Sequence, residues 1–267
     1  MFQATWTGAS CRQPLHGGYK NCPKQVRAMS ARPGVGEERS MRVASYNIRK
    51  AVGLDWRRDP HRVVDVLGEI DADVIALQEA DRRIGTRAGV LPLDRLETEL
   101  GYIMTDVSIR PLSHGWQGNA ILVRSRLFDH VAERILLPTM EPRGAVSVRL
   151  RQPDLEVIGV HLGLTPGMRR KQMLTLQKRL EDCDHPVLLA GDFNEWNSGR
   201  LPFAAPATVV SPGLSFHASR PTASLDRFVL GPGLRSVSAH VHHSALAKRA
   251  SDHLPVVVDI AFTTRNP

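Results

Sequence analysis

Apolar residues recur along the chain with two different periods, and the change of period predicts where helices and strands lie. Asp59–Ile70, Leu93–Leu100 and Pro166–Leu180 carry apolar residues at the spacing of one helix face. Short apolar runs bounded by turn residues predict buried strands. We expect such strands at Met41–Ile48, Val74–Leu77, Asn119–Val123, Ala145–Leu150, Glu156–His161, Val187–Ala190, Leu225–Leu230, Arg235–His242 and Leu254–Phe262.

The order of these elements predicts an α+β fold. Strands outnumber helices, and in the second half of the chain many strands follow one another directly, as in the hairpin that turns at Gln152–Asp154. Two sheets packed face to face, with the helices outside them, give every apolar strand face and helix face a partner. We expect residues 41–264 to form one domain of this kind.

Residues 1–40 differ from the rest of the chain. They show no sustained period of strand or helix, and Gly and Pro interrupt them repeatedly. Basic residues are spread through the segment, which also lacks the apolar run of a secretory signal. We expect a disordered tail or an artefact of the assigned start, with Met29 or Met41 as the alternative first residue.

The formal net charge of the chain is +8, and residues 1–40 contribute half of it. The moderate excess on the remaining residues suits an anionic substrate without singling out DNA. No apolar run approaches the roughly 18–20 residues that a membrane span needs. The three cysteines, Cys11, Cys22 and Cys183, have neither the pattern of a disulfide framework nor the spacing of a zinc site. We therefore expect a soluble, cytoplasmic protein.

Acidic, amide and imidazole side chains fall beside the ends of the predicted strands. Taken singly, each has an ordinary explanation as a turn, a cap or a hydrogen-bonded strand end. Their joint occurrence indicates that the strand ends gather them on one rim of the sheets, where a rigid scaffold presents a site. These residues are Asn47, Glu79, His161, Asp192, Asn194, Asp252 and His253.

Seven short motifs in order resemble the endonuclease/exonuclease/phosphatase superfamily of metal-dependent phosphoesterases. They are Ser45–Ile48, Leu77–Glu79, Gly118–Leu122, Val160–Leu162, Gly191–Asn194, Leu225–Phe228 and Ser251–Pro255. Gly-Asp-Phe-Asn and Ser-Asp-His-Leu-Pro at this separation are the most specific of them. The resemblance extends over residues 43–258. It implies a four-layered αββα sandwich, with two mixed or antiparallel sheets packed face to face and the site at one end of them.

The chemistry of phosphate esters explains a metal site at this rim. A hard, oxygen-liganded cation neutralises charge on the phosphoryl oxygens, and Mg²⁺ prefers carboxylate and water ligands. We expect Glu79 to be the principal ligand, with Asn47 and Asp252 beside it, as the resemblance also implies. Mn²⁺ is the expected substitute for Mg²⁺.

The remaining motif residues are expected to act on water and phosphate. Asp192 would position and deprotonate the attacking water, and Asn194 would hydrogen-bond that water or a phosphoryl oxygen. His161 and His253 would donate protons or hydrogen bonds, with Asp226 fixing the tautomer of His253. Which group is the acid and which the base stays open.

Two further residues are candidates for substrate binding. Asn119 matches a position near the site in the superfamily, and Arg143 precedes a strand where it could clamp phosphate, although an ordinary surface position is the alternative for it. The other histidines, among them His185, match no motif and are expected at the surface or in structural roles.

The resemblance and the residue pattern argue against some classes of substrate but do not identify one. A tyrosine is common at the position of His161 in abasic-site endonucleases, so the resemblance argues against that activity. Glu195–Ser224 offers no platform of aromatic and basic residues for stacked bases. The nearest resemblance is to small bacterial members that share His161–Leu164 and Gly191–Trp196.

We expect a phosphodiester hydrolase of nuclease type. A phosphomonoesterase, a phospholipid- or sphingomyelin-type phosphodiesterase and a non-catalytic phosphate-binding domain are the alternatives. The expected partner is therefore a phosphate-ester substrate, with a nucleic acid, a phospholipid head group and another small phosphodiester left open, and no pattern in the sequence indicates a protein partner.

Overall fold

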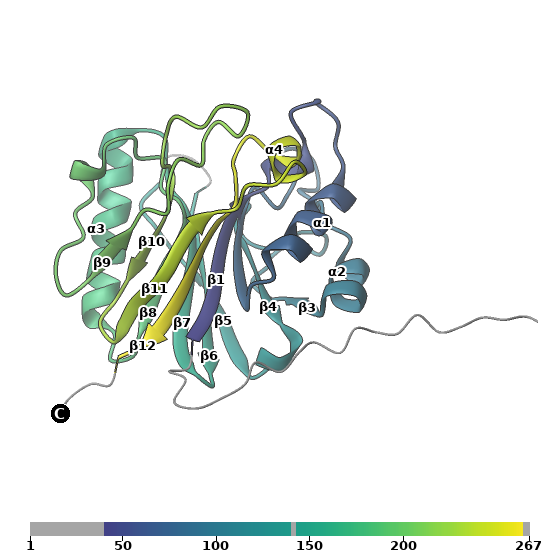
Figure 1. The fold of residues 1–267 in the computed structure, drawn as a ribbon. Coiled ribbons are helices and arrows are strands. Elements are labelled where there is room, and N and C mark those ends of the chain that lie inside the picture. The colour runs from purple at the N-terminus through teal and green to yellow at the C-terminus, as the bar shows by residue number, and fades with distance from the viewer. Residues whose placement is uncertain (1–39, 140–142, 264–267) are drawn as a thin grey trace, which may run out of the picture. The chain divides into compact units, whose positions relative to one another are not determined.

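The computed structural model of the protein describes residues 40–139 and 143–263. The predicted tail, with Cys11 and Cys22 in it, lies outside the described residues. Twelve strands of the described chain form two six-stranded sheets, and four α-helices pack around them (Figure 1).

The first sheet contains β1 (Ser40–Asn47), β2 (Val74–Gln78), β3 (Tyr102–Met104), β4 (Ala120–Arg124), β11 (Leu234–Val241) and β12 (Val256–Phe262). Its strand order is β11-β12-β1-β2-β4-β3. Only the central pair, β1 and β2, runs parallel, because α1 (Pro60–Ile70) connects the two strands. The other neighbours in this sheet are antiparallel.

The second sheet contains β5 (His130–Ile135), β6 (Ala145–Arg151), β7 (Asp154–His161), β8 (Val187–Asp192), β9 (Thr208–Val210) and β10 (Asp226–Leu230). Its order is β5-β6-β7-β8-β10-β9. Here too the single parallel pair, β7 and β8, is joined by a helix, α3 (Pro166–Asp182). The two sheets therefore repeat one arrangement, a parallel pair at the centre with antiparallel strands beside it.

Three apolar cores separate four layers, which are the two sheets and the helices outside each sheet. Because side chains alternate between the two faces of a strand, the strands contribute residues to all three cores. Ile75 of β2 belongs to the core under α1, whereas its neighbour Ala76 belongs to the core between the sheets. Leu188 of β8 likewise faces the core between the sheets, and Leu189 faces the core under α3. The predicted α+β sandwich of two sheets with helices outside is confirmed.

The helices begin and end where the sequence supplies caps. Asp59 accepts a hydrogen bond from the backbone N–H of Arg62 at the start of α1, and Pro60 occupies the first turn. The second helix, α2 (Leu93–Leu100), ends at Gly101, whose φ of 64° is the left-handed conformation that glycine adopts without strain. A short helix, α4 (Ala247–Ala250), precedes β12.

The predicted strands and helices agree with the observed ones to within about two residues at most of their ends. Four short elements, β3, β5, β9 and α4, were not among the predicted ones. Of these, β5 lies at the edge of its sheet and has mostly exposed or half-buried residues. The segment of β5 therefore contains no continuous apolar run from which a buried strand could be predicted.

Candidate active site

The sheet topology brings the chemical residues of both sheets to one end of the sandwich. β1 and β2 run parallel and end there, and β12 is antiparallel to β1, so β12 begins there. In the second sheet, His161 at the end of β7 pairs with Asp192 at the end of β8. Asp226 at the start of the antiparallel β10 pairs with Asp192 from the other side. Six strands thus supply this end with polar side chains.

The carboxylate of Asp192 lies at the centre of the cluster and is almost fully buried. Its Oδ2 accepts a hydrogen bond from Nδ2 of Asn47, at 3.1 Å, which joins the two sheets. The same Oδ2 is 3.5 Å from Nε2 of His161 and 3.7 Å from Nε2 of His253. Its Oδ1 accepts a hydrogen bond from the backbone N–H of Asn194 at 2.9 Å. Both oxygens are therefore held in fixed directions.

His253 lies between two carboxylates. Its Nδ1 is 2.8 Å from Oδ2 of Asp226, and the same oxygen accepts a 2.6 Å hydrogen bond from Oγ of Ser215. Burial disfavours the charge on His253, but the carboxylates of Asp226 and Asp192 outweigh burial and raise its pKa to about 10. His253 is therefore an imidazolium at neutral pH, with Nε2–H directed to the side of Asp192.

His161 has the opposite protonation. Burial lowers its pKa to about 3, and the positive charges of Arg143, His253 and Lys50 add to this effect against the opposing carboxylate of Asp192. The guanidinium of Arg143 lies directly against Nε2 of His161. The site thus holds one charged and one neutral imidazole on either side of the same carboxylate.

Glu79 follows the last residue of β2 and has a φ of 55°, an uncommon conformation for a side chain of this size. The loop at Gly118 supports it, since the N–H of Ala80 donates to the carbonyl of Gly118 at 2.9 Å. The carboxylate of Glu79 pairs with the ammonium of Lys50. Glu79, Lys50, Arg143 and His161 line one cavity.

Asp252 is connected to Asn47 through its chain neighbour, Ser251. The hydroxyl of Ser251 donates to the backbone carbonyl of Asn47 at 2.6 Å. Nε of Arg49 is 3.3 Å from Oδ2 of Asp252. The two carboxylates on this side, Glu79 and Asp252, each therefore face a cationic side chain of the chain itself.

Asn194 and Asn119 make backbone contacts. Nδ2 of Asn194 donates to the carbonyl of Leu162 at 2.9 Å, and its own φ is 51°. Asn119 is fully buried, and its Nδ2 donates to the carbonyl of Gly144 at 2.9 Å. Its Oδ1 has no hydrogen-bond partner among the described residues. A direct role of Asn119 in substrate binding stays a prediction.

The donor set suits a hard divalent cation. Asn47, Glu79 and Asp252 offer an amide oxygen and two carboxylates, which are the ligand types that Mg²⁺ prefers, and the binding of one ion by all three stays a prediction. Two groups of three ligand-type side chains lie within 4.8 Å in the described chain, and one of them is Asp192, Asp226 and His253. Glu79 and Asp252 belong to neither group, and in the structure their carboxylates pair with Lys50 and Arg49 respectively.

Sequence reasoning did not identify the basic residues around these carboxylates. Arg49 and Lys50 lie one residue beyond the end of β1, and this basic pair beside a strand end was a signal that the sequence offered. Arg82, Arg87 and Arg110 line the same cavity as Glu79, from loops whose positions no local pattern reveals. The cavity is therefore more basic than the strand-end residues alone suggest.

Comparisons with known proteins agree with the fold and with the family that the sequence resembles. The model of the Endonuclease/Exonuclease/phosphatase family matches residues 44–253. The uncharacterized protein YbhP of Escherichia coli (strain K12) is 26% identical over 186 residues, which cover 61% of this chain and 70% of YbhP.

Two solved structures show the same fold. The endonuclease/exonuclease/phosphatase from Beutenbergia cavernae DSM 12333 has a TM-score of 0.61 and 24% identity, and the match covers 84% of this chain and 72% of that one. D. rerio TDP2, solved in complex with a single-strand DNA product, has a TM-score of 0.64 and 18% identity, with 83% of this chain and 98% of that chain covered.

Proposed function

The chain belongs to the Endonuclease/Exonuclease/phosphatase family, and on that premise we propose that it is a Mg²⁺-dependent hydrolase of phosphodiesters. The observation that carries the proposal is the position of the Asp192 carboxylate. It lies against Asn47, His161 and His253 at one end of both sheets. A base held between one charged and one neutral imidazole suits the attack of water on phosphorus.

Asn47, Glu79 and Asp252 are the residues proposed to hold the cation. When bound there, Mg²⁺ would neutralise charge on the phosphoryl oxygens, so that they would repel a nucleophile approaching the phosphorus less strongly. The ammonium of Lys50 and the guanidinium of Arg49 pair with the carboxylates of Glu79 and Asp252, so a bound cation would replace these side chains against the same oxygens. Mn²⁺ is proposed as a substitute.

Asp192 is proposed to orient the attacking water and to take its proton. The hydrogen bonds from Asn47 and from the backbone of Asn194 fix the direction of the carboxylate, so no reorganisation is needed during the reaction. Nδ2 of Asn194 donates one hydrogen to the carbonyl of Leu162, and we propose that its second hydrogen is donated to a phosphoryl oxygen or that Oδ1 accepts from the attacking water.

His253 and His161 are proposed to interact with the phosphate in different ways. The charged His253, supported by Asp226, would donate a hydrogen bond or a proton as negative charge builds on oxygen. Nε2 of the neutral His161 accepts from Arg143, so its donor to a phosphoryl oxygen would be Nδ1–H, and Arg143 beside it would compensate the charge of the phosphate. Asp226 is a positioning residue because it acts through His253.

Nucleic acid is the first substrate class to test. The D. rerio TDP2 structure holds a single-strand DNA product, and the arginines that line the cavity beside Glu79 suit an anionic chain. Within the described residues, no helix is long and apolar enough to cross a membrane. Localisation in the cytoplasm stays a prediction.

Hydrolysis of two chromogenic substrates tests the proposal. Turnover of bis(p-nitrophenyl) phosphate that exceeds turnover of p-nitrophenyl phosphate, requires Mg²⁺ or Mn²⁺ and stops with EDTA is the expected result. Asp192→Asn removes the proposed base, and Asp129→Asn is the matched control because Asp129 is exposed in a surface pair with Arg151. Equal loss in both variants, or preference for the monoester, would contradict the proposal.

Plasmid nicking and release of phospholipid head groups then identify the substrate class. Nicking that Asp192→Asn abolishes assigns a nuclease. Head-group release without nicking assigns the lipid-directed alternative.

A further inference from the structure

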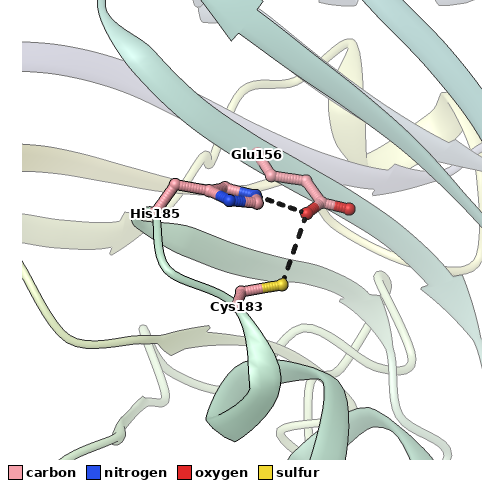
Figure 2. Close-up of side chains that lie close together, drawn as sticks. All are labelled: Glu156, Cys183 and His185. Atoms are coloured by element: carbon pink, nitrogen blue, oxygen red, sulfur yellow. Dashed lines mark hydrogen bonds and ion pairs between the residues drawn. The ribbon is translucent and has the colours of Figure 1, made fainter.

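Three side chains with different metal-binding atoms lie together at the end of the sandwich away from Asp192. Glu156 is near the start of β7, and Cys183 and His185 lie in the connection from α3 to β8 (Figure 2). His161 ends β7 five residues beyond Glu156, which corresponds to roughly 16 Å of strand. The cluster is therefore separate from the candidate active site.

The ligand atoms converge on one point. Oε2 of Glu156 is 2.9 Å from Nε2 of His185 and 3.9 Å from Sγ of Cys183, and Figure 2 shows both side chains directed at this carboxylate. All three atoms lie within 4.8 Å of one another. Tetrahedral zinc with N, O and S ligands separates these atoms by about 3.3–3.6 Å. Small side-chain movements would therefore complete the geometry.

The surrounding residues hold the cluster in place. The side chain of Glu156 is 2% exposed, and its other oxygen, Oε1, accepts a hydrogen bond from Nη2 of Arg179 at 2.7 Å. Nδ1 of His185 is 3.0 Å from Oδ1 of Asp184, the kind of outer acceptor that orients metal-bound histidines. The N–H of Glu156 donates to the carbonyl of Pro186 at 2.9 Å, which holds the connection against β7.

A thiol nucleophile does not fit the same contacts. Both ring nitrogens of His185 contact carboxylate oxygens, of Glu156 and Asp184, so the imidazole is not arranged as a base for Cys183. Burial and then the carboxylate of Glu156 raise the pKa of the Cys183 thiol, which keeps it protonated. A positive ion at this position would reverse that effect and favour the thiolate.

We propose that Glu156, Cys183 and His185 bind a divalent ion of the zinc type. On binding, the ion displaces the proton of the Cys183 thiol to solvent and takes the Nε2 lone pair of neutral His185, whose one ring proton then lies on Nδ1 and is donated to Asp184. Thiolate, imidazole and carboxylate together select zinc over magnesium, and a water molecule fills the fourth position. The site ties the end of α3 and the start of β8 to β7.

Cobalt spectroscopy tests the site because Co²⁺ bound to a thiolate gives a charge-transfer band in the near ultraviolet. The full-length chain with Cys11→Ser and Cys22→Ser retains Cys183 as its one thiol. One equivalent of Co²⁺ is expected to give the band, and Zn²⁺ is expected to displace it. The candidate active site contains no sulfur ligand, so ions bound there do not contribute.

Two substitutions in that background decide the outcome. Cys183→Ser is expected to abolish the band. His185→Gln is expected to weaken Co²⁺ binding by more than the roughly 10–100-fold that loss of an outer partner costs. His240→Gln is the matched control, since His240 is exposed on β11. Absence of the band at excess Co²⁺, or a titration that His185→Gln leaves unchanged, would overturn the proposal.

Discussion

Nδ2 of Asn47 donates a 3.1 Å hydrogen bond to Oδ2 of Asp192, and this contact connects the last residues of β1 and β8, which belong to different sheets. The two residues are 145 positions apart in the chain. Because both are almost fully buried, the contact fixes how the two sheet ends meet. The orientation of the proposed base therefore depends on a residue of the opposite sheet.

Replacement of Asn47 tests this dependence. Asn47→Ala removes the donor to Asp192 and is expected to lower kcat/KM for bis(p-nitrophenyl) phosphate by about 10²-fold, the effect of a small misplacement of a catalytic group. Initial rates at saturating Mg²⁺ measure it, so that a change in cation affinity does not contribute. Unfolding followed by circular dichroism provides the control for fold. Activity within a few-fold of that of the unchanged protein would mean that Asn47 does not position Asp192.

The pair Asp226 and His253 is expected to act as one unit. Asp226→Asn leaves the size of the side chain unchanged but removes the charge that favours the imidazolium, and we expect kcat to fall by about 10²–10⁴-fold, as for loss of acid–base catalysis. His253→Ala is expected to have an effect of similar size.

The double variant distinguishes positioning from a structural role. Because Asp226 acts through His253, Asp226→Asn in the His253→Ala background is expected to add little to the loss in kcat. Kinetics of the two single variants and the double variant measure the coupling. Additive losses would assign Asp226 a role of its own.

Local sequence patterns were sufficient to predict the strands that are buried on both faces. β2 has all five residues buried, and the run Val74–Leu77 predicted it directly. β9 has three residues, none of them fully buried, and its two valines form a run too short to predict a strand. Burial in the core therefore decides how much of the fold a sequence pattern reveals.

The strand-end positions of Asp192 and Asn47 could be predicted, but their contact could not. Strand ends are local properties, whereas the 3.1 Å contact depends on how two sheets pack. Lys50 is a similar case, since its charge is evident in the sequence but its pairing with Glu79 follows from a run of left-handed residues after β1. Contacts between residues far apart in the chain therefore determine those features of the site that sequence patterns do not predict.

Lys50 and Glu79 are expected to affect cation binding in opposite directions. Lys50→Met frees the carboxylate of Glu79 from its ammonium partner, so less Mg²⁺ should be needed for half-maximal activity. Glu79→Gln removes the principal proposed ligand and should raise that concentration by at least about tenfold, in keeping with typical losses at metal sites. Mg²⁺ titrations of activity in the two variants measure both effects. A shift of the same sign in both would argue against a cation at Glu79.

The pairing of Arg42 on β1 with Asp259 on β12 is expected to make stability depend on pH. Nε of Arg42 is 2.8 Å from Oδ1 of Asp259, and Oγ of Ser238 donates to Oδ2 at 2.7 Å. Burial alone would raise the pKa of Asp259, but these hydrogen bonds outweigh it and lower the pKa below its ordinary value. A carboxyl with a depressed pKa in the folded state stabilises the protein above its unfolded pKa of about 3.9.

Asp259→Asn is therefore expected to lower the free energy of unfolding at pH 7 by about 1 kcal/mol or less, because the pair is partly exposed to solvent. The difference from the unchanged protein should persist down to about pH 5 and shrink as the pH falls below about 4, where the Asp259 carboxyl of the unfolded chain is protonated and that of the folded chain then follows. Urea unfolding at pH 7, 5, 4 and 3 measures it. A difference that grows toward low pH would mean that Asp259 has a raised pKa in the fold and that the strand pair β1–β12 is held by its other contacts.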